Sequence, residues 1–235
     1  MAIKTESVQI QSDAGTFGGF FAAPQRGGPV PGVVVIQEIF GVNAHIRDMC
    51  QRFAEAGYAA LAPDLFWHVE RGIELGYTPD DIAKGREIRG KLDNDATVAD
   101  VRAAFAALRA RPETQGHKVG ITGWCYGGLI TYLSACRLDP DAVSAYYGGG
   151  IVNFLAEAEK LRAPSLFHFG EKDPGIPLAE VAQLQAKVQG KPDTAVHVYP
   201  NADHGFNCDH RGSYQEAAAK LAWQRTLEHF GKHLK

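Results

Sequence analysis

The sequence has no long block of basic residues, no apolar run of membrane-spanning length, and no apolar signal-peptide core at its N-terminus. Its formal net charge is -3, so the chain lacks the electrostatic footprint of a nucleic-acid-binding protein. These absences predict a soluble, cytoplasmic protein that binds neither nucleic acid nor a membrane.

A paired cysteine framework is also missing. The four cysteines, Cys50, Cys125, Cys136 and Cys208, are widely spaced and include no CxxC pair. Such spacing is typical of reduced thiols in the cytoplasm rather than of a disulfide scaffold. There are no internal repeats or low-complexity segments, and 45% of the residues are hydrophobic. A chain of this length can bury one substantial core, so we expect residues 1–235 to form a single domain.

Short apolar runs alternate along the chain with longer helical patterns. We expect strands at 8–10 and 18–22 (an opening hairpin), 33–36, 58–62, 118–122, 143–147, 165–169 and 195–199, and helices at 43–56, 80–90, 98–108, 129–138, 178–188 and 213–233. Ser213 and Glu216 match a capping box that would open the last helix. The alternation predicts the α/β class, as a doubly wound, mostly parallel sheet with helices on both faces.

The segment Gly123-Trp124-Cys125-Tyr126-Gly127-Gly128 lies directly after one predicted strand and directly before a predicted helix. Strand, Gly-x-Cys-x-Gly turn and helix form the arrangement of a nucleophile elbow, with Cys125 in the place of the commoner serine. Glycine is required because a Cβ on either neighbour would clash with the strand or the helix. The alternative is a buried cysteine at an ordinary turn, since free cysteine is often a small core hydrophobe.

In an α/β-hydrolase, the catalytic triad appears in the chain order nucleophile, acid, histidine. Asp173, just past the strand that ends at 169, is the acid candidate, although it could merely form an Asx turn before Pro174. Glu171 lies closer to the strand end and is less able to reach a histidine. His204 lies between the last strand and the last helix, where a triad base is expected.

The remaining histidines fit other roles. We expect His168, within a strand, to be a core histidine, and the others to be surface or packing residues: His45, His68, His117, His197, His210, His229 and His233. His204, Cys208 and His210 are possible zinc ligands, but a closed site needs a fourth ligand and no further Cys/His pair has suitable spacing. We expect no metal and no other cofactor.

The chemistry explains why these residue types are needed. The thiolate is the attacking species, so Cys125 needs a base, which His204 supplies while Asp173 holds the imidazole in the correct tautomer. The dipole of the helix after the elbow further favours the sulfur anion. Two backbone amides must stabilise the oxyanion, and we expect them to be those of Tyr126 and Ile39.

With these motifs the chain resembles the dienelactone hydrolases (carboxymethylenebutenolidases) over essentially its whole length. The resemblance is carried, in order, by Gln37-Glu38-Ile39-Phe40-Gly41-Val42-Asn43, Ala62-Pro63-Asp64-Leu65, the elbow, Gly170-Glu171-Lys172-Asp173 and Asp203-His204-Gly205-Phe206. It implies one α/β-hydrolase domain and a Cys125–His204–Asp173 triad. It also implies that Glu38 contacts the resting thiol and takes part in its activation; from the residues alone, Glu38 could equally be a solvated loop acid.

The activity that the resemblance implies is the opening of an enol-lactone that carries a carboxylate, dienelactone, to give maleylacetate. Cys125 would attack the lactone carbonyl, an enolate would leave, and water activated by His204 would hydrolyse the thioester. Family members clamp the substrate carboxylate with arginines. The candidates here are Arg211, which follows Asn207-Cys208-Asp209-His210 where an arginine is expected, and Arg86 and Arg89. The last two lie in the irregular segment 66–91, which we expect to be a loop with the short helix 80–90.

These arginines could also be ordinary surface residues, and Trp124 and Tyr126 either shape the pocket or pack the elbow. The departure at 207–210 leaves the specific lactone open. Two other functions therefore stay in view. One is a broader carboxylesterase or thioesterase, and the other is a thiol-based sensor or binding protein in which Cys125 reacts without turnover. We expect a small-molecule lactone or ester as the only partner, and a monomer.

Overall fold

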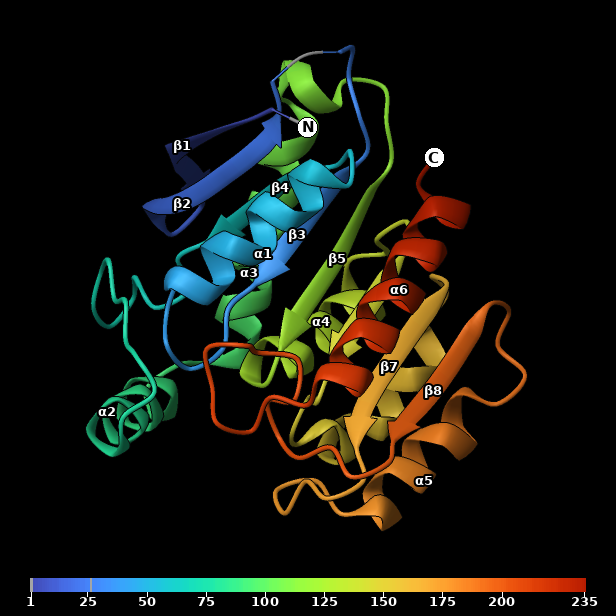
Figure 1. Ribbon diagram of the computed structural model, residues 1–235. Helices are drawn as coiled ribbons and strands as arrows, with labels where there is room; N and C mark the ends of the chain where they lie inside the picture. Colours follow the sequence, from blue (N-terminus) through green and yellow to red (C-terminus); the bar gives the residue numbers. More distant parts are fainter. Residues whose placement is uncertain (1, 26) are drawn as a thin grey trace. The chain divides into compact units, whose positions relative to one another are not determined.

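The computed structural model describes residues 2–25 and 27–235 and divides the chain into two compact units. The first unit comprises residues 1–121 with 234–235, and the second comprises 122–233. Their helices and strands are labelled in Figure 1. That residues 1–235 form one domain stays a prediction.

The first unit is built on β1 (Ile3–Ser12), β2 (Gly15–Pro24), β4 (Ala59–Pro63) and β3 (Gly32–Ile36), in that spatial order. The β1–β2 and β2–β4 pairs are antiparallel, and β3 pairs with β4 in parallel. All residues of β3 and β4 are buried, as their continuous apolar sequences indicate. Strand β5 (Val119–Trp124) begins next to β3 and continues into the second unit.

The opening hairpin is longer than the sequence indicated. We predicted strands of three and five residues, whereas β1 and β2 have ten residues each. Most of β1 is exposed, so it carries polar residues and shows almost no apolar pattern. Backbone pairing with β2 continues along its whole length from Ile3 to Ser12 all the same.

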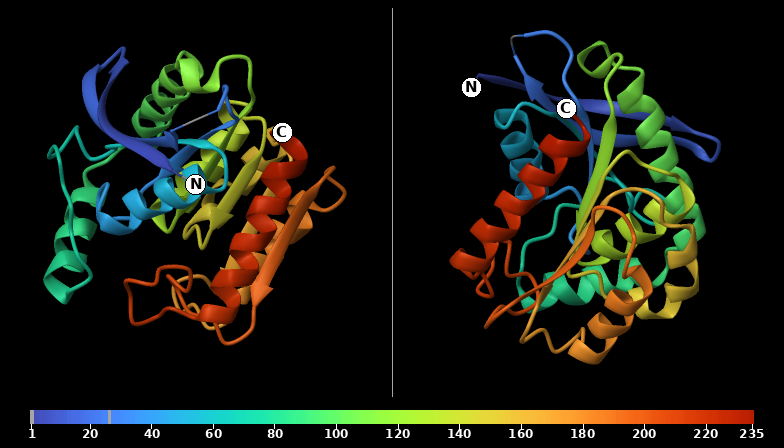
Figure 2. Two further views of the ribbon diagram at one scale, coloured as in Figure 1. Left: turned by 45° about the horizontal axis from the view of Figure 1, so that its top comes forward. Right: turned by 90° about the vertical axis from the view of Figure 1, so that its right-hand side faces the viewer.

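Helices cover both faces of the strands in the first unit. Helix α1 (Ala44–Glu55) lies on one face and α3 (Asn94–Arg109) on the other, as Figure 2 shows, and α2 (Pro79–Gly90) lies within the irregular segment 66–91. Asn43 caps α1 as predicted, accepting a hydrogen bond of 3.2 Å from the Ile46 amide. Helix α3 begins earlier than its apolar pattern because Asp93 accepts bonds from the first amides. A short 3₁₀ turn, Pro112–Thr114, follows it.

In the second unit, β5 is followed in space by the parallel strands β6 (Val143–Tyr146), β7 (Ser165–Gly170) and β8 (Thr194–Tyr199). Helix α6 covers one face, and α4 and α5 cover the other (Figures 1 and 2). These helices are α4 (Tyr126–Arg137), α5 (Leu178–Val188) and α6 (Glu216–His233). Mostly parallel strands covered by helices on both faces confirm the predicted α/β class.

Two local expectations need correction. The capping box at Ser213 and Glu216 does not form, because α6 begins only at Glu216, and the side chain of Gln215 instead accepts the Ala218 amide at 2.6 Å. A 3₁₀ segment, η2 (Ile151–Lys160), was not predicted. Its backbone leaves helical geometry at Phe154, so it has no continuous helical period to detect.

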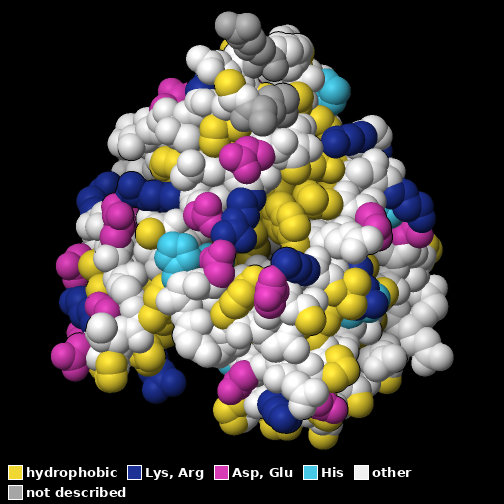
Figure 3. Space-filling view, in the orientation of Figure 1, with side chains coloured by type: hydrophobic (Ala, Val, Ile, Leu, Met, Phe, Trp, Pro, Cys, Tyr) yellow, Lys and Arg dark blue, Asp and Glu magenta, His cyan; other side chains and the backbone are white. Residues whose placement is uncertain are grey.

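Charge is mixed on the surface. On the face shown in Figure 3, Lys and Arg side chains are interspersed with Asp and Glu rather than gathered into a block of one sign. Within the described residues, no helix is both long and apolar enough to cross a bilayer.

Candidate active site

Cys125 lies on the predicted elbow, between the end of β5 and the start of α4. Its backbone has φ 56° and ψ -118°, a conformation that L-residues rarely adopt, and its amide donates a 3.1 Å hydrogen bond to the Tyr146 carbonyl oxygen. A Cβ on Gly123 would overlap with the carbonyl oxygen of Gly127, so only glycine fits there. The turn therefore holds a half-buried thiol at the first turn of a helix.

His204 and Asp173 come together in the same unit. The Asp173 Oδ2 and His204 Nδ1 atoms are 2.7 Å apart, and the Cys125 side chain is hydrogen-bonded to His204. Asp173 is buried, and its Oδ1 also accepts the Gly175 amide at 2.8 Å, so the Asx turn forms as well. Glu171 instead accepts the amide of Asn201 at 2.9 Å. The structure thus places the three predicted triad residues in one hydrogen-bonded chain.

The charges around His204 favour its protonated form. Burial lowers its pKa, but the Cys125 thiolate and the Asp173 carboxylate, through charge and hydrogen bonds, outweigh burial and raise the pKa to about 10. The imidazole of His204 therefore binds a proton more tightly than that of an ordinary histidine.

This raised pKa predicts a specific pH dependence of stability. An unfolded histidine has a pKa of about 6.5, so between that pH and about 10 the folded protein holds a proton that the unfolded chain releases. The resulting stability is fully present below the lower value and is lost as the pH rises through the upper one. We expect the free energy of unfolding in urea to fall more steeply across this range for the wild type than for H204Q. Parallel curves for the two proteins would refute the assignment.

Tyr147 is a neighbour of His204 that the sequence analysis did not single out. Its ring centroid lies 5.0 Å from that of His204 and 5.4 Å from that of Phe206. Tyr147 is fully buried and has φ 35°, which is strained for a tyrosine. Its ring restricts the orientation of the imidazole, and no motif in the sequence signals this contact.

Three predicted residues flank the triad in the second unit. Trp124 has no exposed surface, and its Nε1 donates to Asn207 Oδ1 at 2.8 Å while its ring stacks on Tyr146. It therefore packs the elbow, and its place among the substrate-binding candidates is corrected. Tyr126 is nearly buried and is the first residue of α4, where amides have no acceptor within their own helix. The Arg211 guanidinium lies against the backbone of Gly205, where a Cβ would be 2.6 Å from its Nη1.

Glu38 and Ile39 follow β3 in the first unit. Glu38 is fully buried, so the alternative of a solvated loop acid is wrong. Its Oε2 accepts a 3.4 Å hydrogen bond from the hydroxyl of Tyr77. Ile39 is half-buried, and α2 approaches it so closely that a Cβ on Gly85 would overlap with its carbonyl oxygen.

The two arginines of α2 differ. Arg89 donates to the Leu92 carbonyl oxygen at 3.3 Å and to Asn94 Oδ1 at 2.9 Å, so its guanidinium joins the end of α2 to the start of α3. These bonds give Arg89 a structural role at this junction, and its binding of substrate stays a prediction. Arg86 is exposed on the same helix, next to Gly85.

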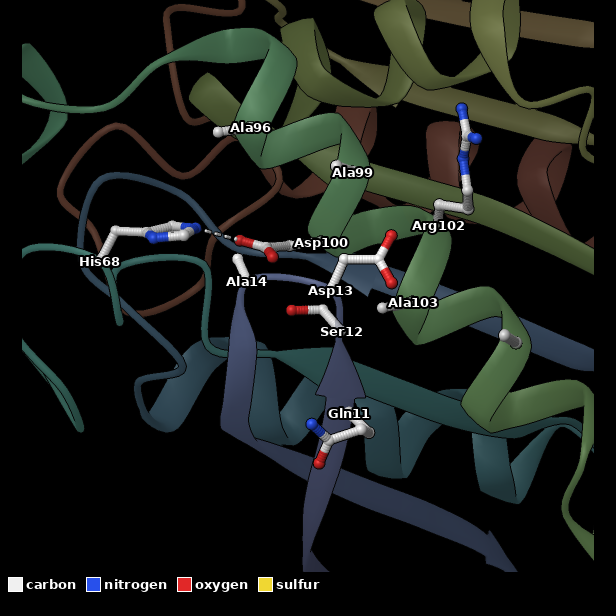
Figure 4. A pocket seen from close by; sticks show the side chains of 11 residues that line it. Gln11, Ser12, Asp13, Ala14, His68, Ala96, Ala99, Asp100, Arg102 and Ala103 are labelled. Carbon is white, nitrogen blue, oxygen red and sulfur yellow. Dashed lines mark hydrogen bonds and ion pairs between the residues drawn. The ribbon is translucent and has the colours of Figure 1, made fainter.

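Two histidines outside the triad, His168 and His68, contact other protein side chains. His168 is fully buried and bonded to Tyr199 and Ser144, as predicted for a core histidine. His68 lies 2.8 Å from a carboxylate oxygen of the buried Asp100, at the edge of a cavity of about 510 Å³ (Figure 4). This cavity, between the β1–β2 turn and α3, contains none of the predicted site residues.

The three possible zinc ligands are in unlike surroundings. His204 Nδ1 is occupied by Asp173, Cys208 is buried, and His210 is exposed. In the described part of the chain, their ligand atoms do not form one group.

The chain is similar to known proteins along nearly its whole length. Residues 17–234 match the dienelactone hydrolase family. A Synechocystis sp. protein named "Putative carboxymethylenebutenolidase" is 37% identical over 242 residues, which cover 99% of this chain and 98% of that protein. The carboxymethylenebutenolidase of Pseudomonas putida is 36% identical over 229 residues, 95% of each chain.

A solved structure, named as that of a "Putative Dienelactone Hydrolase" from Klebsiella pneumoniae, matches with a TM-score of 0.89 and 34% identity, over 99% of this chain and 100% of that chain. This similarity confirms the predicted α/β-hydrolase fold. The protein is thus a hydrolase of lactone or other carboxylic ester bonds, and the chain belongs to the dienelactone hydrolase family.

Proposed function

We propose that this protein is a cysteine-dependent hydrolase that opens an enol-lactone, dienelactone, to give maleylacetate through a thioester acyl-enzyme. The observation that carries the proposal is the hydrogen-bonded chain Asp173–His204–Cys125, with the thiol on a strained elbow. The names of relatives such as the Pseudomonas putida carboxymethylenebutenolidase support the substrate class.

In the proposed mechanism, the Cys125 thiolate attacks the lactone carbonyl carbon. The amides of Tyr126 and Ile39 stabilise the oxyanion, and collapse of the tetrahedral intermediate releases the enolate and leaves a thioester. His204, which took the thiol proton, gives this proton to the enolate and becomes neutral. It then takes a proton from water as the water attacks the thioester, with Asp173 holding the imidazole. Hydroxide addition and loss of the thiolate give the free acid and regenerate Cys125.

Glu38 is proposed as the carboxylate that takes part in activating the thiol when substrate arrives. Its complete burial supports this role, because a buried carboxylate is retained only at a cost in solvation. Arg86 and Arg211 are proposed to bind the carboxylate of the substrate. Both are reachable from solvent, and Arg211 packs beside the residue that follows His204.

One observation favours a second candidate, a carboxylesterase or thioesterase with small neutral substrates. Arg89 is engaged at the α2–α3 junction, and Cys208 is buried in the segment where the family resemblance led us to expect an arginine. With fewer guanidinium groups available, a carboxylate on the substrate contributes less to binding.

We also propose that the protein acts as a monomer in the cytoplasm on a small lactone or ester, and not on nucleic acid or a membrane. The four cysteines, all free, support a reducing compartment.

Decay of the ultraviolet absorbance of cis- and trans-dienelactone tests the substrate, with 4-nitrophenyl acetate as the neutral comparison. We expect kcat/KM for dienelactone to exceed that for the neutral ester by at least about tenfold, because one charge-assisted hydrogen bond between an arginine and the substrate carboxylate contributes about that factor. No decay, with good turnover of the neutral ester, would replace dienelactone by the second candidate. Alkylation of Cys125 without hydrolysis of any ester would point to the thiol sensor.

A further inference from the structure

The segment that connects β4 to α2 clamps the loop that carries Glu38. We call residues 72–77 the strap and residues 37–43 the Glu38 loop. The Leu75 amide donates a 2.9 Å hydrogen bond to the Phe40 carbonyl oxygen, and Gly41 and Glu74 form an antiparallel bridge. Gly41 has φ 77°, and a Cβ there would overlap with the carbonyl oxygen of Ile73. The two backbones are therefore in direct contact.

Side chains also stabilise the contact between the strap and the Glu38 loop. Arg47 forms an ion pair with Glu74 of the strap and donates from Nε to the Val42 carbonyl oxygen at 3.1 Å. Asn43 Nδ2 donates to the Leu75 carbonyl oxygen at 3.0 Å. These bonds hold the strap and the Glu38 loop in one arrangement, so the last residue of the strap, Tyr77, has a defined position over the loop.

The donors and acceptors then define the direction of the Tyr77 proton. The Oδ1 atom of Asn43 accepts the Ile46 amide, so the amide group of Asn43 presents its Nδ2 donor to Tyr77, at 3.3 Å from the hydroxyl oxygen. A phenol that accepts from Asn43 has its single proton left to donate, and the Glu38 carboxylate lies 3.4 Å away. The Tyr77 ring also packs edge-on against Phe40, at 4.7 Å between centroids.

We propose that Tyr77 is a positioning residue for the reaction: its hydroxyl, oriented by Asn43, holds the buried Glu38 carboxylate ionised and in the orientation needed for thiol activation. This inference rests on the role of Glu38 in the proposed function. Glu38 is fully buried, and a carboxylate without water needs hydrogen-bond donors to stay ionised. The strap brings one such donor, the Tyr77 hydroxyl, to the Glu38 loop, although Tyr77 and Glu38 are 39 residues apart in the sequence.

The test is a double-mutant cycle with Y77F and E38Q. Y77F keeps the ring against Phe40 and the backbone bonds of the strap, so it removes the hydroxyl alone. We expect kcat to fall about tenfold, the value of a hydrogen bond to a charged group, with KM changed less than about twofold. In the E38Q background, Y77F must lower kcat by less than about twofold, because the carboxylate charge to which the Tyr77 hydroxyl donates is absent. Y58F, a buried tyrosine of the same unit outside the site, is the matched control and should retain full activity.

If Y77F lowered kcat by the same factor in the wild-type and E38Q proteins, the proposal would be overturned, since the effect of the Tyr77 hydroxyl would then not depend on Glu38. If E38Q itself keeps full activity, the role of Glu38 in the proposed function fails. Infrared titration then tests independently whether the Tyr77 hydroxyl donates to the Glu38 carboxylate. The carboxyl band that E38Q removes reports Glu38 alone, and Y77F must move its titration to higher pH. A band that does not move would overturn the inference.

Discussion

Cys125→Ala is expected to abolish hydrolysis of every lactone and ester, with kcat/KM reduced by at least about 10⁴-fold. The sulfur is the atom that forms the thioester, and no other nucleophile stands on the elbow to replace it. Alanine takes the same strained backbone position without added bulk, so the elbow should keep its shape. The measurement is the initial rate with dienelactone and with 4-nitrophenyl acetate, together with mass spectrometry of the acyl-enzyme.

Cys136→Ala is the matched control, because Cys136 lies on α4, the helix that follows Cys125, and is buried away from the hydrogen-bonded chain of the triad. Its thiol has a pKa raised to about 11 by burial, so it stays protonated and inert at neutral pH. We expect this variant to keep its activity and its acyl-enzyme. Substantial hydrolysis by the Cys125→Ala protein would exclude the thioester route.

Asp173→Asn is expected to lower kcat by about 10³- to 10⁴-fold with little change in fold. The carboxylate accepts the Nδ1 proton of His204 at 2.7 Å, and an amide nitrogen in its place would favour the other tautomer. It would also remove one of the two charges that raise the pKa of His204, so the titration of the imidazole should move to lower pH. Rates over a range of pH and nuclear magnetic resonance of His204 measure the two effects.

Glu171→Gln provides the control for Asp173, since Glu171 lies two residues away and the one hydrogen bond described for its side chain is from the amide of Asn201. We expect a loss of less than about threefold for this surface carboxylate. If Asp173→Asn retained more than about a tenth of the wild-type rate, Asp173 would be an Asx-turn residue and not the orienting acid.

Features with local causes could be predicted from the sequence. The Gly-x-Cys-x-Gly turn between an apolar run and a helix indicated the elbow because neighbouring Cβ atoms would clash within a few residues. The Asn43 cap depends on a side chain and an amide three residues apart. Cys125, Asp173 and His204 could be expected to come together because each lies in a loop at the carboxyl end of a parallel strand, and these ends meet at one edge of a sheet.

Short-range reasoning failed where a partner strand or a weak local signal decided the outcome. The hairpin β1–β2 extends well beyond its apolar residues because backbone pairing does not require apolar side chains. The last helix begins at Glu216 because the side chain of Gln215 competes with Ser213 for the role of cap. Neither the extent of the hairpin nor the start of the last helix can be predicted from the periodicity of one segment.

The α/β class, the elbow and the candidate triad residues could thus be predicted from the amino-acid sequence, since each depends on periodicity or on a motif within one loop. The contacts between distant segments became known only from the folded chain. Arg89 joins two helices while Arg86 stays exposed, and Tyr147 packs on His204. Tyr77 reaches Glu38 because a connection far along the chain folds back over the loop. Contacts of this kind depend on the packing of distant segments, and no spacing or composition within either segment encodes them.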